Sequence, residues 1–103
     1  MEECLFCKII KKEVPAKIVY EDADVVVFPD ITPKARVHLL IVPTAHIKSF
    51  LDLREEQLSV LTKMSKVVQR LIVDQKLTRA YQLLFNGGKH QHVPHLHLHL
   101  MAE

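Results

Sequence analysis

Residues 95–100 constrain the fold more than any other segment, because histidine and leucine alternate strictly along them. Successive side chains of a β-strand point to opposite faces. A strand here therefore places three imidazoles on one face, about 6.6 Å apart, and three leucines on the other. With seven histidines in 103 residues, three at alternate positions arise by chance only about 3% of the time. The pattern predicts a strand with one packed face and one chemically active face.

Length and composition predict one small folded domain over residues 1–103. This length does not accommodate two hydrophobic cores, and 49% hydrophobic and 25% charged residues are close to the globular average. The net charge of +2 is small and scattered, which argues against nucleic acid or a membrane surface as partner. The N-terminal sequence lacks a targeting pattern, and no apolar run approaches the roughly 20 residues that cross a bilayer, so we expect a cytoplasmic protein.

The first half of the chain is predicted to form a short helix and three strands. Apolar residues recur at helical spacing over 5–11, and β-branched runs at 17–20 and 25–28 flank an acidic turn typical of an antiparallel hairpin. A third strand is expected over 37–42, with apolar side chains on both faces and Pro43 at its end.

The second half is predicted to form one long helix and two strands. Asp52 and Glu55 have the spacing of a capping box, and apolar residues recur at helical spacing after them. Together they predict a helix over 52–75. This pattern covers about half the circumference, which predicts either a second contact surface, formed by another copy of the chain, or a helix sunk more deeply into its own core. Strands are expected over 81–85 and from Pro94 onward.

The predicted elements define the fold class. Short connections favour antiparallel pairing, so we expect an α+β fold with a five-stranded antiparallel sheet, one short helix and one long helix. Dimerisation is expected through the long helix and an edge strand.

Two chemistries suit the alternate histidines. They can hold a catalytic zinc with an open water position. Alternatively, one neutral ring nitrogen attacks phosphorus while a neighbouring histidine neutralises charge or protonates the leaving group. Asn86, the N–H groups of Gly87 and Gly88, and Gln91 are candidate donors to phosphate oxygens, although a Gly-Gly turn also serves as an ordinary strand connection.

Several segments match one protein family in the same order along nearly the whole chain. They are residues 6–17, 28–33, 37–38, 42–47, 91–94 and the run His-Leu-His-Leu-His-Leu-Met at 95–101. The last run is similar to the His-φ-His-φ-His-φ-φ signature of the histidine triad (HIT) superfamily, and the whole set resembles its Hint branch. The resemblance implies a HIT-like homodimer that binds a purine nucleotide. It further implies hydrolysis of nucleoside 5′-phosphoramidates, such as AMP joined to an amine, through a covalent nucleotidyl-histidine.

The resemblance also implies catalytic roles for four histidines. His97 is the expected nucleophile, and His99 is the expected phosphate contact. His95 is expected to buttress His97 and help fix its tautomer, and His38 to be a further histidine of the active site. No cofactor is implied for the chemistry.

The nucleotide contacts implied by the resemblance are polar and apolar. Asp30 is expected to accept from the ribose hydroxyls, since one carboxylate can accept from a vicinal diol. Asn86 and Gln91 are expected near the α-phosphate, and His92 stands where many members carry a serine or threonine. The expected apolar walls, for each of which core packing is the alternative, are Leu5, Phe6, Ile9, Phe28, Ile31 and Leu40.

Cys4 and Cys7 allow three interpretations: a redox pair, an inert pair, or half of a zinc site. Resemblance to bacterial members with this pair implies His46 and His95 as the remaining ligands. Such a Cys₂His₂ site is structural, because protein atoms fill all four positions. We expect zinc here, with reduced thiols as the alternative.

Three alternative functions compete with phosphoramidate hydrolysis. One is a zinc-dependent hydrolase that uses the alternate histidines themselves. The others are a dinucleoside polyphosphate hydrolase and a nucleotide-binding regulatory module with incidental catalysis.

Overall fold

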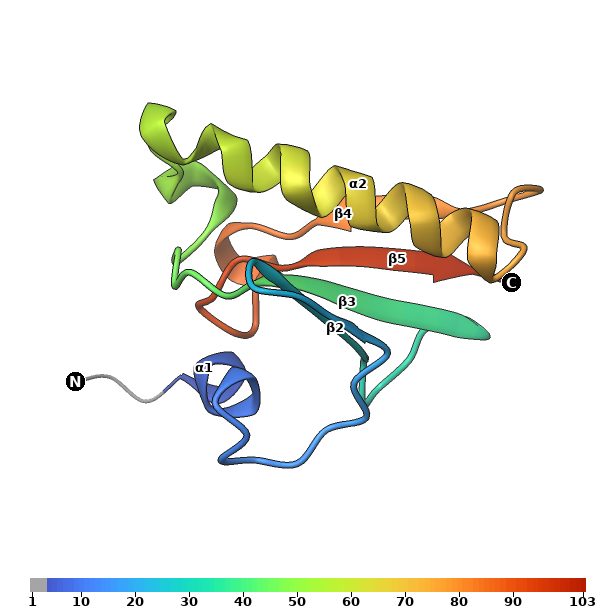
Figure 1. The fold of residues 1–103 in the computed structure, drawn as a ribbon, viewed down its shortest axis with the longest axis horizontal. Helices are drawn as coiled ribbons and strands as arrows, with labels where there is room; N and C mark the ends of the chain where they lie inside the picture. The colour runs from blue at the N-terminus through green and yellow to red at the C-terminus, as the bar shows by residue number, and fades with distance from the viewer. Residues whose placement is uncertain (1–3) are drawn as a thin grey trace.

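A computed structural model describes residues 4–103, in which five strands form one antiparallel sheet with the order β1-β2-β3-β5-β4 (Figure 1). The elements are α1 (Leu5–Ile10), β1 (Tyr20–Glu21), β2 (Val25–Pro29), β3 (Val37–Pro43), α2 (Leu58–Asp74), β4 (Gln82–Phe85) and β5 (Leu98–Ala102). Short 3₁₀ helices occupy Phe50–Asp52, Glu55–Gln57 and Gly88–His90. The predicted α+β class, with a five-stranded antiparallel sheet, one short helix and one long helix, is confirmed.

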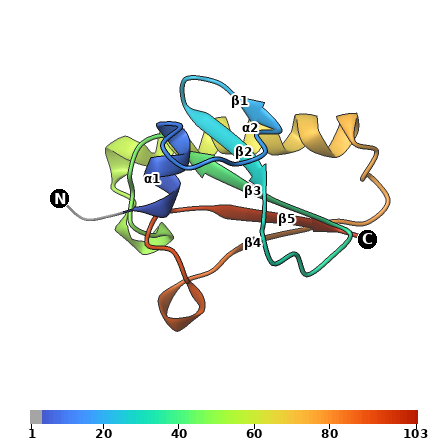
Figure 2. The same ribbon diagram turned by 90° about the horizontal axis from the view of Figure 1, so that it is seen from below.

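The two α-helices lie on opposite faces of the sheet (Figures 1 and 2). On the α2 face, Ile41 and Leu100 belong to a buried apolar cluster that includes the inner side of α2. On the α1 face, Leu40 packs with Phe6 and Ile9 of α1. Strand β3 thus contributes to two apolar layers, which explains why its sequence is apolar at nearly every position.

Helix α2 is covered mainly by its own sheet. Its buried residues are Met64, Val67, Val68, Leu71 and Ile72. Val60 and Leu61 are half-buried against the same cluster, whereas Leu58 is 49% exposed. The wide apolar pattern is therefore largely explained by packing within the chain.

No helix among residues 4–103 combines the length and the apolar character needed to cross a bilayer. The N-terminal sequence used for the expectation about targeting lies partly outside the described residues.

The predicted start of the long helix was wrong. Asp52 ends a 3₁₀ helix, and its carboxylate accepts from the Ser49 hydroxyl at 2.6 Å. Leu53 then adopts extended dihedral angles, which interrupts any helix from residue 52. Arg54 N–H donates to the Gln57 side-chain oxygen at 3.0 Å, one turn before α2 begins. The missed feature is Leu53, which is half-buried and packs against the core between the two short 3₁₀ helices.

The first strand is shorter than predicted and lies closer to the turn. Only Tyr20–Glu21 forms β1, although Val19 N–H still donates to Val27 O at 2.8 Å. The turn is held by Asp22, whose carboxylate accepts from the N–H groups of Asp24 and Val25. Upstream of residue 19 the chain leaves the sheet to line a cavity.

The last strand begins later than predicted, at Leu98 rather than near Pro94. Leu98 pairs with both Ile41 of β3 and Phe85 of β4. Before it, the backbone is hydrogen-bonded outside the sheet, since Leu96 N–H donates to Ile47 O at 2.6 Å. The predicted separation of faces nevertheless holds, because Leu96, Leu98 and Leu100 all lie in the α2-side core.

We predict that Leu100→Ala lowers the free energy of unfolding by about 2–5 kcal/mol, because Leu100 is fully buried and truncation leaves a cavity. Urea unfolding followed by circular dichroism measures this change. Leu51→Ala is the matched control, since Leu51 is 91% exposed and its truncation should have little effect. Equal stability of the two variants would contradict the assignment of the core.

Candidate functional site

A cavity of about 830 Å³, here called the histidine cavity, opens on the α1 side of the sheet. Its volume is within the range of small-molecule sites. Its wall contains the catalytic candidates His38, His97 and His99. It also contains these predicted nucleotide contacts: Leu5, Phe6, Ile9, Phe28, Asp30, Ile31, Leu40, Asn86 and His92.

Gln91 lies outside this cavity, in contrast to its predicted place near a phosphate. Its side-chain amide donates to Lys48 O at 2.8 Å and to Val93 O at 2.9 Å, and it faces a separate hollow of about 550 Å³ beside Phe50. The backbone of Gln91 is extended, so the next side chain, His92, points to the opposite side and reaches the histidine cavity. Gln91 thus positions this loop.

The tautomer of His97 is fixed by a main-chain carbonyl. Its Nδ1 lies 2.7 Å from His95 O, which accepts only, so Nδ1 carries the proton. The lone pair is therefore on Nε2, and burial lowers the pKa of His97, which favours this neutral form. The ring of Phe6 packs edge-on against His97, with centroids 5.0 Å apart. His97 is a neutral, oriented imidazole in the cavity wall.

His38 and His99 form a directed chain of hydrogen bonds. Lys34 N–H donates to His38 Nδ1 at 3.0 Å, so the proton of His38 is on Nε2 and is donated to His99 Nδ1 at 2.8 Å. His99 then carries its proton on Nε2, which lies 3.3 Å from the side-chain amide of Asn86. A turn of this amide by 180° exchanges its nitrogen and oxygen, and the oxygen then accepts the His99 proton. Burial, then the neighbouring His97 and His38, lower the pKa of His99 to about 4. A neutral N–H donor thus stands beside His97.

Asp30 lies at the same wall and stays ionised. Burial alone would raise the pKa of Asp30, but hydrogen bonds from Thr32 and the nearby His38 and His99 hold it below its usual value. Oδ1 accepts from Thr32 N–H at 2.9 Å, and Oδ2 lies 3.5 Å from His38 Nε2. A partly exposed carboxylate therefore faces a cavity of imidazoles.

The alternate histidines His95, His97 and His99 do not converge on one metal position. Asp30, His38 and His99 lie close enough to share an ion, but His38 receives Lys34 N–H on Nδ1 and so has no second lone pair for a metal without becoming an imidazolate. His97 belongs to neither of the two candidate ligand sets among the described residues. This arrangement disfavours a catalytic zinc on the alternate histidines.

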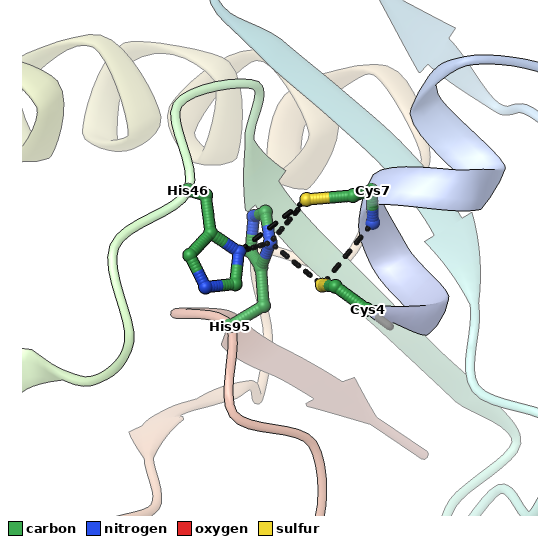
Figure 3. A group of neighbouring side chains, drawn as sticks. All are labelled: Cys4, Cys7, His46 and His95. Carbon is green, nitrogen blue, oxygen red and sulfur yellow. Dashed lines mark hydrogen bonds between the residues drawn. The ribbon is translucent and has the colours of Figure 1, made fainter. Parts of the chain in front are cut away.

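The imidazole of His95 lies in a cysteine–histidine cluster formed with Cys4, Cys7 and His46 (Figure 3). Its Nε2 donates to Pro43 O at 2.9 Å, which leaves the Nδ1 lone pair facing the cluster. The predicted support of His97 is thus supplied by the carbonyl of His95, and the ring serves a different site. The predicted placement on one face holds for this ring too, because Phe6 of α1 packs edge-on against both His95 and His97, but the His95 ring is not part of the histidine-cavity wall.

The cluster has the dimensions of a tetrahedral zinc site. His95 Nδ1 lies 3.1 Å from His46 Nδ1, 3.3 Å from Cys4 Sγ and 3.6 Å from Cys7 Sγ. Usual zinc bond lengths place two nitrogens about 3.3 Å apart, and nitrogen and sulfur about 3.6 Å apart. Two Nδ1 atoms at 3.1 Å also need a cation or proton between them. The four residues therefore fit a closed zinc site.

Several cavity residues escaped the sequence analysis. They are Val14, Pro15, Ala16, Lys17, Pro29, Thr32, Lys34, Leu84, His90, Val93 and Met101. The sequence contains a signal for His90, since His90 and His92 alternate as the later histidines do. It contains no signal for the N–H of Lys34 that orients His38, because a main-chain contact within a loop does not depend on the pattern of side chains.

Comparisons with known proteins agree with the fold and the site. The family described as "Scavenger mRNA decapping enzyme C-term binding" matches residues 3–103. The chain is 43% identical to Protein HitA of Neisseria gonorrhoeae, over 99% of this chain and 97% of that protein. It is 37% identical to the purine nucleoside phosphoramidase of Escherichia coli K12, over 98% and 87%.

A solved structure extends this likeness to three dimensions. A HIT family hydrolase from Clostridium thermocellum superposes with a TM-score of 0.95 at 39% identity, covering 100% of this chain and 92% of that one. The chain therefore belongs to the histidine triad superfamily.

We predict that His99 stays neutral down to about pH 4, as an NMR titration of its ring will measure. An unfolded histidine binds its proton near pH 6.5, so the unfolded state takes up this proton first as the pH falls. The His99 contribution to stability is then lost between about pH 6.5 and 4, and His99→Gln should unfold with a shallower pH dependence there. A His99 midpoint near the unfolded value would contradict this prediction.

Proposed function

We propose that this protein hydrolyses purine nucleoside 5′-phosphoramidates, with His97 as the nucleophile. The observation that carries the proposal is the Nδ1–H bond from His97 to His95 O at 2.7 Å, which leaves a lone pair on Nε2. A neighbouring N–H on His99 suits a phosphate oxygen. The likeness to a purine nucleoside phosphoramidase at 37% identity supports the same substrate class.

The proposed reaction has two displacements at phosphorus. His97 Nε2 forms a bond to the α-phosphorus while the bond from phosphorus to the amine nitrogen breaks, and the departing amine takes up a proton. Water then attacks phosphorus, loses a proton, and His97 leaves with its electron pair. Neutral donors on His99 and Asn86 stabilise the oxygen charge without repelling a nucleophilic imidazole.

The cavity offers a place for each part of a nucleotide. Asp30 accepts from the ribose hydroxyls, a role supported by its ionised state and partial exposure. The apolar walls formed by Phe6, Phe28 and Leu40 suit the flat face of a base. The cleavable bond then lies at the His97 end of the cavity.

A structural zinc ion is the second part of the proposal, with Cys4, Cys7, His46 and His95 as its ligands. Burial and the neighbouring Cys4 raise the pKa of the Cys7 thiol, so the metal would supply the positive charge that stabilises thiolates here. It would hold α1 against the segment before β5. It takes no part in the reaction.

The proposed partner is a second copy of the chain, bound through β4 and α2. Strand β4 is a sheet edge, where unpaired backbone groups favour association with another strand. Leu83 on β4 is 48% exposed, and Leu58 at the start of α2 is 49% exposed. These apolar side chains give a second copy a surface to cover.

We predict that His97→Asn lowers kcat by several powers of ten while nucleotide affinity is retained. Mass spectrometry of a quenched reaction should find a nucleotide adduct on His97 in the unsubstituted protein. Comparable turnover by the variant would falsify the role of His97. Faster cleavage of a dinucleoside polyphosphate than of the phosphoramidate would favour that alternative substrate.

We predict about one zinc per chain in untagged protein, measured by mass spectrometry of metals. His46→Gln should lose most of this zinc, since His46 is an exposed ligand whose replacement leaves the core intact. His90→Gln is the matched control and should keep it, because His90 lies outside the cluster. Chelation should lower the melting temperature of the control much more than that of His46→Gln. Zinc well below one per chain would remove the metal site.

A further inference from the structure

We propose that His92 is the acid that protonates the departing amine. This inference rests on the proposed function, since it assigns a group to a step of that reaction. The buried histidines do not supply this proton: the His97 proton is bonded to a carbonyl, and the protons of His38 and His99 run along one directed chain.

Burial disfavours the inner histidines as cationic acids. His38, His97 and His99 are all buried, and burial lowers the pKa of each ring, which favours its neutral form. His92, in contrast, is exposed and still lines the cavity. An imidazole that is in contact with both water and substrate can take up a proton from solvent and deliver it inward.

The backbone holds His92 in this position. On one side, Gln91 is tied by its amide to Lys48 O and Val93 O. On the other side, Val93 packs against the apolar cluster of α1, and Pro94 restricts the chain that follows. The extended backbone at Gln91 then sends His92 into the cavity. The side chain is exposed, but its attachment point is anchored.

His90 shares the wall but is less suited to the step. Both histidines line the cavity and are exposed. Of the two, His92 is the one that stands between two anchored residues, since Gln91 donates to Lys48 O and Val93 packs against the apolar cluster of α1. His90 ends the 3₁₀ helix Gly88–His90, whose first residue has a positive φ of 58°. His90 is therefore a natural control for His92.

The proton balance closes over both displacements. As His97 Nε2 bonds to phosphorus, the electron pair of the P–N bond goes to the amine nitrogen, which takes the proton of the His92 imidazolium. His92 is then neutral and can accept the proton that the attacking water loses in the second displacement. The net reaction consumes one water and releases the amine and the nucleotide, and His92 returns to its starting state.

The test is a comparison of leaving groups on one nucleotide. A basic alkylamine cannot leave from AMP without a proton, whereas p-nitrophenol leaves from the corresponding ester as a stable anion. We expect His92→Gln to lower kcat/KM for the phosphoramidate of AMP with an alkylamine by about 100-fold or more. The kcat/KM for the p-nitrophenyl ester of AMP should fall far less. The ratio of the two kcat/KM values isolates proton donation from binding. His90→Gln should leave this ratio unchanged.

Three results would overturn the inference. They are an equal loss on both substrates, no loss on either, or the same change of ratio in His90→Gln. Melting temperature and AMP affinity of His92→Gln check that the loop and the cavity are intact. Failure of the proposed function is distinguishable, because it appears in the unsubstituted protein as no cleavage of either substrate, or as full activity of His97→Asn.

Discussion

The hydrogen bond from His97 Nδ1–H to the carbonyl of His95 is the interaction on which the site depends. It decides which nitrogen of His97 carries the lone pair, and it links the proposed nucleophile to a residue whose ring belongs to another cluster. The His95 imidazole is fully buried between Pro43 O and the thiols of Cys4 and Cys7. Because ring and carbonyl belong to one residue, an interaction that holds the ring also holds the acceptor of His97.

Helix α1 connects the two sites from the other direction. Cys4 caps its N-terminus by accepting from Cys7 N–H at 3.3 Å, and both sulfurs face His95. Phe6 lies between these cysteines in sequence. The centroid of its ring is 5.0 Å from that of His97 and 5.9 Å from that of His95. A helix of six residues is too short to be stable alone. Its docking on the sheet therefore supplies both a wall of the cavity and half of the cysteine–histidine cluster.

The sequence predicted what repeats and missed what depends on single distant contacts. Alternation of histidine and leucine correctly separated His97 and His99 from Leu98 and Leu100, because that pattern follows directly from strand geometry. Alternation alone did not predict the partners of the His95 ring, which are Pro43 O and the cysteine–histidine cluster; that cluster was expected only from the resemblance. The partners of Gln91 were not predicted for a similar reason: Lys48 O and Val93 O are main-chain atoms that no residue pattern reveals.

The buried imidazoles also explain why the loop before β5 matters chemically. His38, His97 and His99 stay neutral because each additional positive charge inside the cavity would be costly, and their protons are already directed to carbonyl, imidazole or amide acceptors. Such a set can bind phosphate oxygens and attack phosphorus, but it has no excess proton to give. In the proposed reaction, the proton that leaves with the amine then comes from an exposed group, and the part of the cavity wall contributed by the loop carries the exposed imidazoles of His90 and His92. In the proposed reaction, burial thus separates the two roles, with the nucleophile on the sheet and the proton donor on the exposed loop.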